Sequence, residues 1–398
     1  MHQITEDQGE LETIARLDER INVEEGNVRE RRATIIHKGY GSQYLLGIEK
    51  FVKDIEKRWK GGFVDETTRY AQVSKIRELY LGKKYYRRMN EWLKRYSDMY
   101  RYSTRVEVFY DACKELRLLS PDPFCLGEPG DTCGADGMRC MDLFNALIDR
   151  VRERCQSREF TERERLRLVN AEKNKQSVLV LEEAMFSKET GRSRWLVLSL
   201  TLRYKPKFRC GTTYETVQQH RDRFFAARRF NRLMSGIRNY VWAIEQGEDT
   251  GLHLHVILFY SAEHNRDEFI AKQIGEYWVD AITEGKGEYW NSNAERLKRK
   301  YKERGHGVGV GQINWNDTER REALRRNLVY LAKAEQYLMI KCAERVRTFG
   351  MGKAPEKVKA GRPRVDVDAN NATENLIDGE SSDGADGNVV SPDEDWTD

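Results

Sequence analysis

Long apolar runs are missing from this chain of 398 residues. No stretch approaches the roughly 18 consecutive apolar residues that a membrane-spanning helix needs. The first residues, MHQITEDQGELETIARLDER, are acidic, whereas a secretory signal starts basic and continues apolar. These absences predict a cytoplasmic protein with no membrane partner.

Cysteine is also scarce, which excludes a disulfide-stapled class of protein. The seven cysteines are an odd number spread along a long chain, so we expect reduced thiols and no disulfide framework. Apolar residues still make up 39% of the chain, which is enough for one large core or two modest domains. The chain should therefore fold as a globular protein over most of its length.

Lysine and arginine are absent from the end of the chain. Residues 365–398 hold eleven acidic side chains, so the rest of a chain with net charge +4 carries +15. A body this basic favours a polyanionic partner, with nucleic acid first. A well-solvated surface would explain the same charge, so charge alone does not decide between the two.

Three zones follow one another along the sequence. Residues 1–170 read as charged amphipathic helices of unknown role, and residues 171–350 alternate short apolar runs with basic helices. Residues 351–398 read as a basic linker and then an acidic tail, which is too poor in large apolar residues to fold and is expected to be disordered. The middle zone predicts an α+β fold, a central antiparallel sheet flanked by helices. Its strands are expected at 194–203, 238–246, 252–260 and 308–314, and its helices at 215–235, 265–283 and 317–341.

The stretch YVWAIEQGEDTGLHLHVILFY, residues 240–260, carries the clearest chemical signal. Side chains alternate along a strand, so His253 and His255 share one face. If the cluster GEDTG closes a hairpin, Glu245 lies across from His253 on that same face. Two imidazoles and a carboxylate can hold a divalent ion such as Mg or Mn. A structural role for the two histidines is the alternative, and a register slip of one residue would turn Glu245 away.

A second element lies downstream, in RRNLVYLAKAEQYLMIK at 325–341. Tyr330 and Lys333 stand three apart on a predicted helix, so they share a face. A tyrosine hydroxyl has an ordinary pKa of about 10 and needs a nearby cation or a polarised phosphate to act as a nucleophile. The pattern YxxK is also ordinary helix sequence, so it is weak by itself.

The helical wheel of this segment separates leucines from tyrosines. One stripe holds Leu324, Leu328, Leu331 and Leu338, and the nearly opposite side holds Tyr330, Lys333 and Tyr337. We therefore expect Tyr330 to be presented and not buried. Glu335 falls inside the leucine stripe, which fits only if the helix bends or ends near it.

Three motifs in this order resemble the HUH superfamily of replication initiators and relaxases: LVLSLTL (196–202), HLH (253–255) and YLAK (330–333). More closely, residues 194–364 look like the inovirus gene-2-type replication protein family of filamentous phages and prophages, with RTFGMG (347–352) after the tyrosine motif. The resemblance covers somewhat under half of the chain. It implies a fold similar to an RNA-recognition motif.

The resemblance also implies a role for each matching residue. His253, His255 and Glu245 would bind the metal, Tyr330 would form a 5′-phosphotyrosyl link, and Lys333 would assist it. The protein would then be a metal-dependent endonuclease that nicks and rejoins origin DNA, single-stranded or supercoiled, to start rolling-circle replication. A host helicase and polymerase would be its partners.

Two further residues come from the same resemblance. Thr201 matches the first motif, where it would help to place DNA. Tyr337 is a possible second nucleophile, since relatives with two catalytic tyrosines exist in the superfamily.

Basic residues near the hairpin extend the nucleic-acid prediction. The arginines before and at the start of the first hairpin strand are Arg221, Arg223, Arg228, Arg229, Arg232 and Arg238. We take Arg228, Arg229 and Arg232 as DNA-binding, because arginine neutralises phosphates. The interleaved Phe224, Phe225 and Phe230 fit a helix core better than a base-stacking surface.

The glycine-rich run GHGVGVGQI at 305–313 is not a phosphate loop, because it lacks the Gly-Lys-Ser/Thr ending. It reads as a strand at which another backbone, such as DNA, comes close. His306 within it is expected at the surface.

Other functions stay open. A relaxase or transposase of the same superfamily would use the same residues, and a prophage DNA-binding protein with a decayed site would retain only some of the chemistry. An unrelated binuclear metallohydrolase is disfavoured, because residues 256–258 supply no further ligands after His255.

Overall fold

A computed structural model describes the larger part of the chain. The described residues are 23–28, 31–36, 42–57, 61–67, 74–98, 100–119, 125–133, 137–189, 192–247, 251–263, 265–303, 305–334, 338–340 and 347–355. The predicted acidic tail lies outside them.

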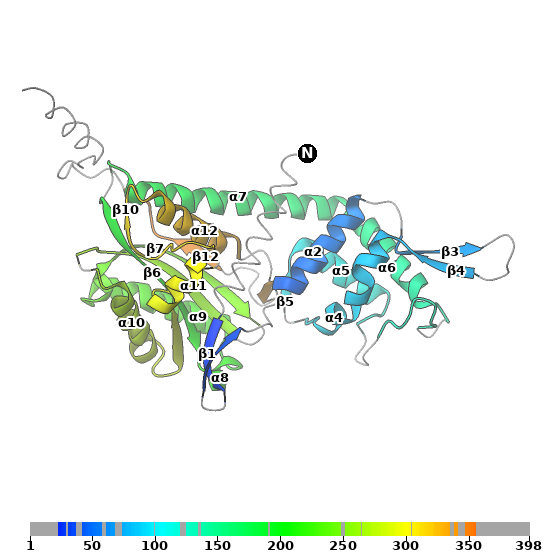
Figure 1. Ribbon diagram of the computed structural model, residues 1–398, viewed down its shortest axis with the longest axis horizontal. Helices are drawn as coiled ribbons and strands as arrows, with labels where there is room; N and C mark the ends of the chain where they lie inside the picture. The colour runs from blue at the N-terminus through cyan, green and yellow to red at the C-terminus, as the bar shows by residue number, and fades with distance from the viewer. Residues whose placement is uncertain are drawn as a thin grey trace, which may run out of the picture. The chain divides into compact units, whose positions relative to one another are not determined.

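Six antiparallel strands form the central sheet (Figure 1). The strand order is β10-β6-β8-β7-β12, and β9 pairs with the same edge of β6 as β10 does. The strands are β6 (Arg194–Tyr204), β7 (Ile237–Gly247), β8 (Gly251–Tyr260), β9 (Gly287–Asn291), β10 (Gly311–Asn314) and β12 (Phe349–Met351). The predicted central antiparallel sheet flanked by helices is confirmed, although β9 and β12 were not foreseen.

Helices cover both faces of the sheet, as Figure 1 shows. On one face, α7 (Arg158–Phe186) and α12 (Thr318–Ala334) pack on Val241, Ile257 and neighbouring side chains. On the other face, α9 (Tyr214–Ala226) and α10 (Asp267–Tyr277) pack on apolar side chains, mostly leucines, that occupy the alternate positions of the strands. Because strand side chains alternate, the two cores draw on different residues of the same strands.

The three predicted helices of this zone are shorter than expected. The first ends at Ala226 and is followed by two short 3₁₀ turns, and the second gives way after Tyr277 to a π turn. The third ends at Ala334, and Leu338–Ile340 forms β11, which pairs with β5 (Tyr100–Tyr102). The prediction of a helix to residue 341 is therefore wrong. Glu335, which the sequence placed inside the leucine stripe, lies outside the described residues.

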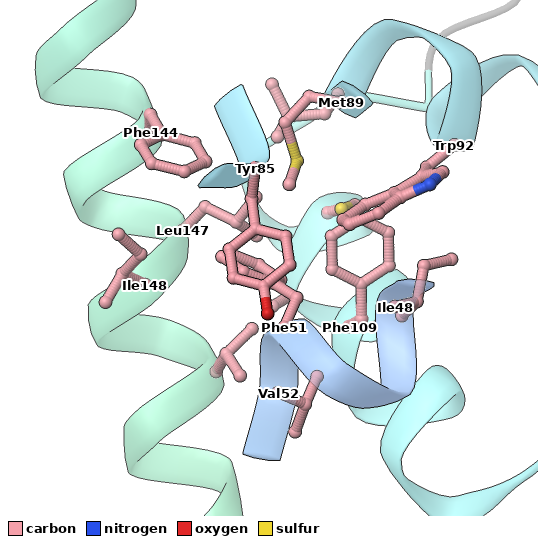
Figure 2. Close-up of a cluster of buried hydrophobic side chains, with 14 of the residues drawn as sticks. Ile48, Phe51, Val52, Tyr85, Met89, Trp92, Phe109, Phe144, Leu147 and Ile148 are labelled. Carbon is pink, nitrogen blue, oxygen red and sulfur yellow. The ribbon is translucent and has the colours of Figure 1, made fainter. Parts of the chain in front are cut away.

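The N-terminal zone has an aromatic helical core of its own. Its helices are α2 (Ser42–Lys57), α3 (Tyr80–Tyr85), α4 (Met89–Lys94), α5 (Thr104–Glu115) and α6 (Cys140–Cys155). Figure 2 shows Phe51, Tyr85, Trp92, Phe109 and Phe144 together in this core. The ring centroid of Phe51 lies 5.0 to 6.0 Å from the ring centroids of the other four. The predicted mainly helical region is confirmed.

Short hairpins interrupt this helical zone. They are β1 (Val23–Val28) with β2 (Arg31–Ile36), and β3 (Phe63–Thr67) with β4 (Ser74–Glu78). The boundary predicted at residue 170 falls inside α7, which continues through it without a break. None of the described helices is both long and apolar enough to cross a membrane.

Helix α7 forms ion pairs along its length. Glu164, near its start, pairs with Arg105 of α5. Glu182, near its end, is fully buried and accepts hydrogen bonds from Arg321 at 2.7 Å and Arg325 at 2.8 Å, both on α12. These bonds fix the helix that carries Tyr330 against α7.

Candidate metal centre

The hairpin of β7 and β8 has the predicted register. Glu245 pairs with His253, and Gln246 pairs with Leu252. His253 and His255 point toward the α12 side, because Leu252 and Leu254 belong to the core on the opposite face. The alternation of polar and apolar side chains in the sequence therefore predicted correctly which residues of the hairpin share a face.

These three side chains meet at one buried point. The Nε2 atoms of His253 and His255 lie 3.1 Å apart. Glu245 Oε2 lies 3.2 Å from Nε2 of His255 and 3.7 Å from Nε2 of His253. The histidines are buried, and one ligand atom from each residue lies within 4.8 Å of the others. This cluster can hold a metal ion.

The other nitrogen of each imidazole has its own partner. Nδ1 of His253 lies 2.9 Å from the carbonyl oxygen of Gly251. Since a carbonyl only accepts, Nδ1 donates, and in a neutral ring Nε2 is then the nitrogen with the lone pair that a metal needs. Nδ1 of His255 lies 3.0 Å from Oγ1 of Thr201. Both rings are thus oriented with Nε2 toward Glu245.

The electrostatics of the cluster also fit a cation. Burial by itself raises the pKa of Glu245, but His255 and His253 outweigh it and hold that pKa well below the ordinary value of 4.5. Burial lowers the pKa of His253, which favours the neutral ring that binds metals. Glu245 Oε1 is buried and has no hydrogen-bond partner among the described residues. An orphaned carboxylate oxygen beside two imidazoles is the donor set of a metal site.

Thr201 acts on His255 and not at the surface. Thr201 is 4% exposed and pairs with His255 across strands β6 and β8. The hydroxyl is therefore engaged with the imidazole, which leaves no exposed group for DNA. Outer partners of this kind fix the orientation of a metal ligand.

Tyr330 reaches the cluster from α12. Its hydroxyl donates a hydrogen bond to Glu245 Oε2 at 3.2 Å, and its ring meets that of His255 edge to face at 6.3 Å between centroids. The prediction that Tyr330 is presented and not buried is wrong, since it is 3% exposed. The reason is that α12 packs against both α7 and the sheet, so more than the leucine stripe is covered.

The other two residues predicted on this helix are less defined. Lys333 lies one turn after Tyr330 in α12, but its side chain falls outside the described residues. Tyr337 lies outside them altogether.

A small cavity of about 30 Å³ adjoins Tyr330 and His255. His306 and Asn327 line it, with Nε2 of His306 and Oδ1 of Asn327 2.8 Å apart. His306 is 6% exposed, so its predicted surface position is wrong. Asn327 was not singled out from the sequence, although its spacing of three residues from Tyr330 puts it on the same helical face.

The glycine-rich run does meet another backbone, but that backbone is α12 and not DNA. A Cβ on Gly309 would lie 2.6 Å from backbone atoms of Ala323 and Leu324. Only glycine permits this approach, which brings the run against the helix of Tyr330. The strand itself begins later than predicted, at Gly311.

The three arginines predicted to bind DNA have different surroundings. Arg228 donates to the carbonyl of Ile237 at 3.0 Å and stacks over Tyr240, which gives it a structural role. Arg229 and Arg232 are exposed. Of the interleaved phenylalanines, Phe224 is buried as expected, whereas Phe230 is 75% exposed.

Comparison with known families locates this site within a domain. Residues 215–352, about a third of the chain, match the family model of the YagK/YfjJ C-terminal domain. Glu245, both histidines and Tyr330 lie inside the matched segment, whereas Thr201 lies before it. No curated protein and no solved structure gives a significant match to the chain. The matching family is not the filamentous-phage initiator family that the motifs resemble, so a relation to those initiators stays a prediction.

Proposed function

We propose that this protein nicks single-stranded DNA by attack of Tyr330 on a backbone phosphodiester. The observation that supports the proposal is the hydrogen bond from the Tyr330 hydroxyl to Glu245, a member of the metal-binding cluster. Tyr330, 85 residues from Glu245 in sequence, contacts two of the three candidate metal ligands, Glu245 and His255. Such convergence is the geometry that group transfer to a tyrosine requires.

Glu245, His253 and His255 would hold Mg or Mn. A divalent ion bound there supplies positive charge that polarises a phosphodiester. Glu245 suits the role of a ligand better than that of a base, because its lowered pKa makes it a weak proton acceptor. Its contact with Tyr330 instead aims the phenolic oxygen at the centre.

The covalent step exchanges one phosphate ester for another. A bond forms between the Tyr330 oxygen and phosphorus, and the bond from phosphorus to the 3′ oxygen breaks. The phenolic proton is released, and the departing oxygen takes one up. Lys333, one turn further along α12, is assigned to stabilise the charge on the phenolic oxygen. The free 3′ hydroxyl is the end that a polymerase extends.

The motif order adds the biological setting. Because the three motifs resemble HUH initiators, we propose that the substrate is origin DNA and that nicking starts rolling-circle replication. A host helicase and polymerase would then act on the product.

Strand cleavage tests the proposal. Labelled single strands that tile the DNA beside the gene of this protein would be incubated with Mn and the wild type, Tyr330→Phe or Tyr337→Phe. We expect one strand to be cut by the wild type and by Tyr337→Phe but not by Tyr330→Phe. Cleavage by Tyr330→Phe at the wild-type rate would overturn the proposal.

A DNA-binding protein without nicking activity is the second candidate. It is favoured by the burial of Tyr330, which is 3% exposed and would have to be uncovered for a phosphate to reach it. Under this alternative, the wild type binds the same strands and cuts none of them.

A further inference from the structure

A second hollow lies at the far end of the β7 and β8 hairpin from the histidines. It has a volume of about 860 Å³ and is open to solvent. Its walls come from the turn before β7, the start of β7, the end of β8 and the start of α10. A hollow of this size accommodates a ligand as large as a nucleotide.

Three arginines line this hollow and are exposed: Arg232, Arg238 and Arg266. None of the three forms an ion pair with another residue in the part of the chain that the structure describes. The one carboxylate in the lining, Glu263, accepts a hydrogen bond from Ser261 at 3.0 Å. Three guanidinium groups against one carboxylate leave an excess of positive charge, which favours phosphate.

Aromatic surface accompanies the charge. Phe269, on the first turn of α10, is 53% exposed in the lining. Tyr260 forms a fixed wall, since its hydroxyl donates to the Leu233 carbonyl at 3.0 Å and its ring lies so close to Gly236 that a Cβ there would be 2.2 Å from it. An exposed phenylalanine beside unpaired arginines is suited to stacking an unpaired base.

This surface is separate from the metal centre. Tyr260 is five residues beyond His255 on β8 and points to the opposite face, so the two lie roughly 16 Å apart along the strand. A DNA strand that contacts the hollow does not thereby occupy the metal centre.

We propose that this hollow binds single-stranded DNA, with backbone phosphates on Arg232, Arg238 and Arg266 and a base stacked on Phe269. The identity of the ligand as DNA rests on the proposed nicking function, whereas the binding surface stands on its own contacts. Of the three arginines predicted to bind DNA, only Arg232 belongs to it. Arg266 and Phe269 were not singled out from the sequence because they follow the hairpin and meet Arg232 only in the fold.

Binding would be measured by fluorescence anisotropy with a labelled oligothymidylate of about 20 nucleotides, long enough for one groove. All proteins would carry Tyr330→Phe, so that cleavage does not interfere. The test variant is Arg232→Ala/Arg238→Ala/Arg266→Ala. Its matched control is Arg87→Ala/Arg88→Ala/Arg158→Ala, which removes three exposed arginines from the N-terminal zone and changes the net charge equally.

We expect the test variant to bind about 100-fold more weakly at 0.1 M salt, with a salt slope reduced by about 2, as the loss of three phosphate contacts predicts. The control should stay within about twofold of its parent. Phe269→Ala should weaken the single strand about tenfold and leave a duplex of the same length unchanged, since only unpaired bases stack. Replacing the three arginines by lysine should retain most of the affinity.

Two outcomes would overturn the proposal: unchanged affinity of the test variant, or equal losses in test and control variants. An acidic protein as the true ligand would give the first outcome. If the wild type cuts no DNA but the test variant loses binding, the nicking proposal fails and the hollow stands. If the wild type cuts DNA and the test variant binds normally, the nicking proposal stands and the proposal of DNA binding in the hollow fails.

Discussion

The N-terminal helical zone and the sheet both shield carboxylates from solvent, but the two regions differ in the groups that these carboxylates contact. In the helical zone, Glu49 and Glu164 lie beside Arg105, and at the junction of α7 and α12 Glu182 lies between two arginines. These guanidinium groups stay charged at any ordinary pH. A structural role, in which each ion pair joins two helices, is enough to account for these carboxylates.

Glu245 on the sheet is different. Its neighbours are two imidazoles and a phenol, and no lysine or arginine among the described residues pairs with it. The Glu245 side chain is 14% exposed and its Oε1 has no hydrogen-bond partner among the described residues, so a bound cation would complete its surroundings. The comparison teaches that the partner of a shielded carboxylate, more than its burial, distinguishes a candidate metal site from a structural ion pair.

The largest expected effect is on metal binding. His253→Ala/His255→Ala should weaken binding of Mn by more than 100-fold, because both imidazole ligands are lost and outer partners alone are worth 10- to 100-fold. Isothermal titration with Mn measures this. His220→Gln is the control, since His220 bonds to Tyr204 and lies outside the cluster. Equal affinities of the double variant and the wild type would show that the cluster is not a metal site.

The contrast between the two kinds of carboxylate can be tested by the same substitution at two positions. Glu182→Gln should lower the free energy of unfolding by about 3 kcal/mol, because two arginines lose a buried partner, and should leave Mn affinity intact. Glu245→Gln should abolish Mn affinity and should lower the free energy of unfolding of the metal-free protein by less than Glu182→Gln does, because no guanidinium loses its partner. Denaturant unfolding and titration measure the two quantities.

Glu183→Gln is the matched control for the stability effect. Glu183 pairs with the same two arginines but is 63% exposed, so its loss should cost less than about 1 kcal/mol. Equal destabilisation by Glu182→Gln and Glu183→Gln would contradict the importance given to burial. Similar behaviour of Glu182→Gln and Glu245→Gln would remove the distinction between the two sites.

The hairpin was the most predictable part of the molecule. Alternation along residues 240–260 and the turn cluster fix which face each side chain takes, and a carboxylate opposite a histidine follows from register alone. Thr201 was matched by motif, but its contact with His255 depends on the pairing of β6 with β8. Local pattern does not reveal which strand lies next to which.

The helix of Tyr330 was less predictable. Its residues follow a helical period up to residue 341, yet Leu338–Ile340 pairs with a strand from the N-terminal zone. The burial of Tyr330 and His306 depends on α7 and on the close approach at Gly309. These contacts join segments far apart in sequence, so residue periodicity could not reveal them.

A smaller effect should follow from loosening the orientation of one ligand. Thr201→Val removes the hydroxyl beside Nδ1 of His255 and should weaken Mn binding by about 10- to 100-fold with little change in stability. Thr201→Ser keeps the hydroxyl and should retain the affinity. Wild-type affinity in Thr201→Val would mean that packing alone orients the imidazole.

The most direct test of a shared centre for metal and nucleophile is the chemical identity of the covalent product. A strand cut by the wild type in the presence of Mn would be trapped on the protein, digested and mapped by peptide mass. We expect the nucleotide on Tyr330, and no adduct when the metal is removed by a chelator. An adduct on Tyr337, or an equal yield of adduct without metal, would contradict a centre built from Glu245, His253, His255 and Tyr330.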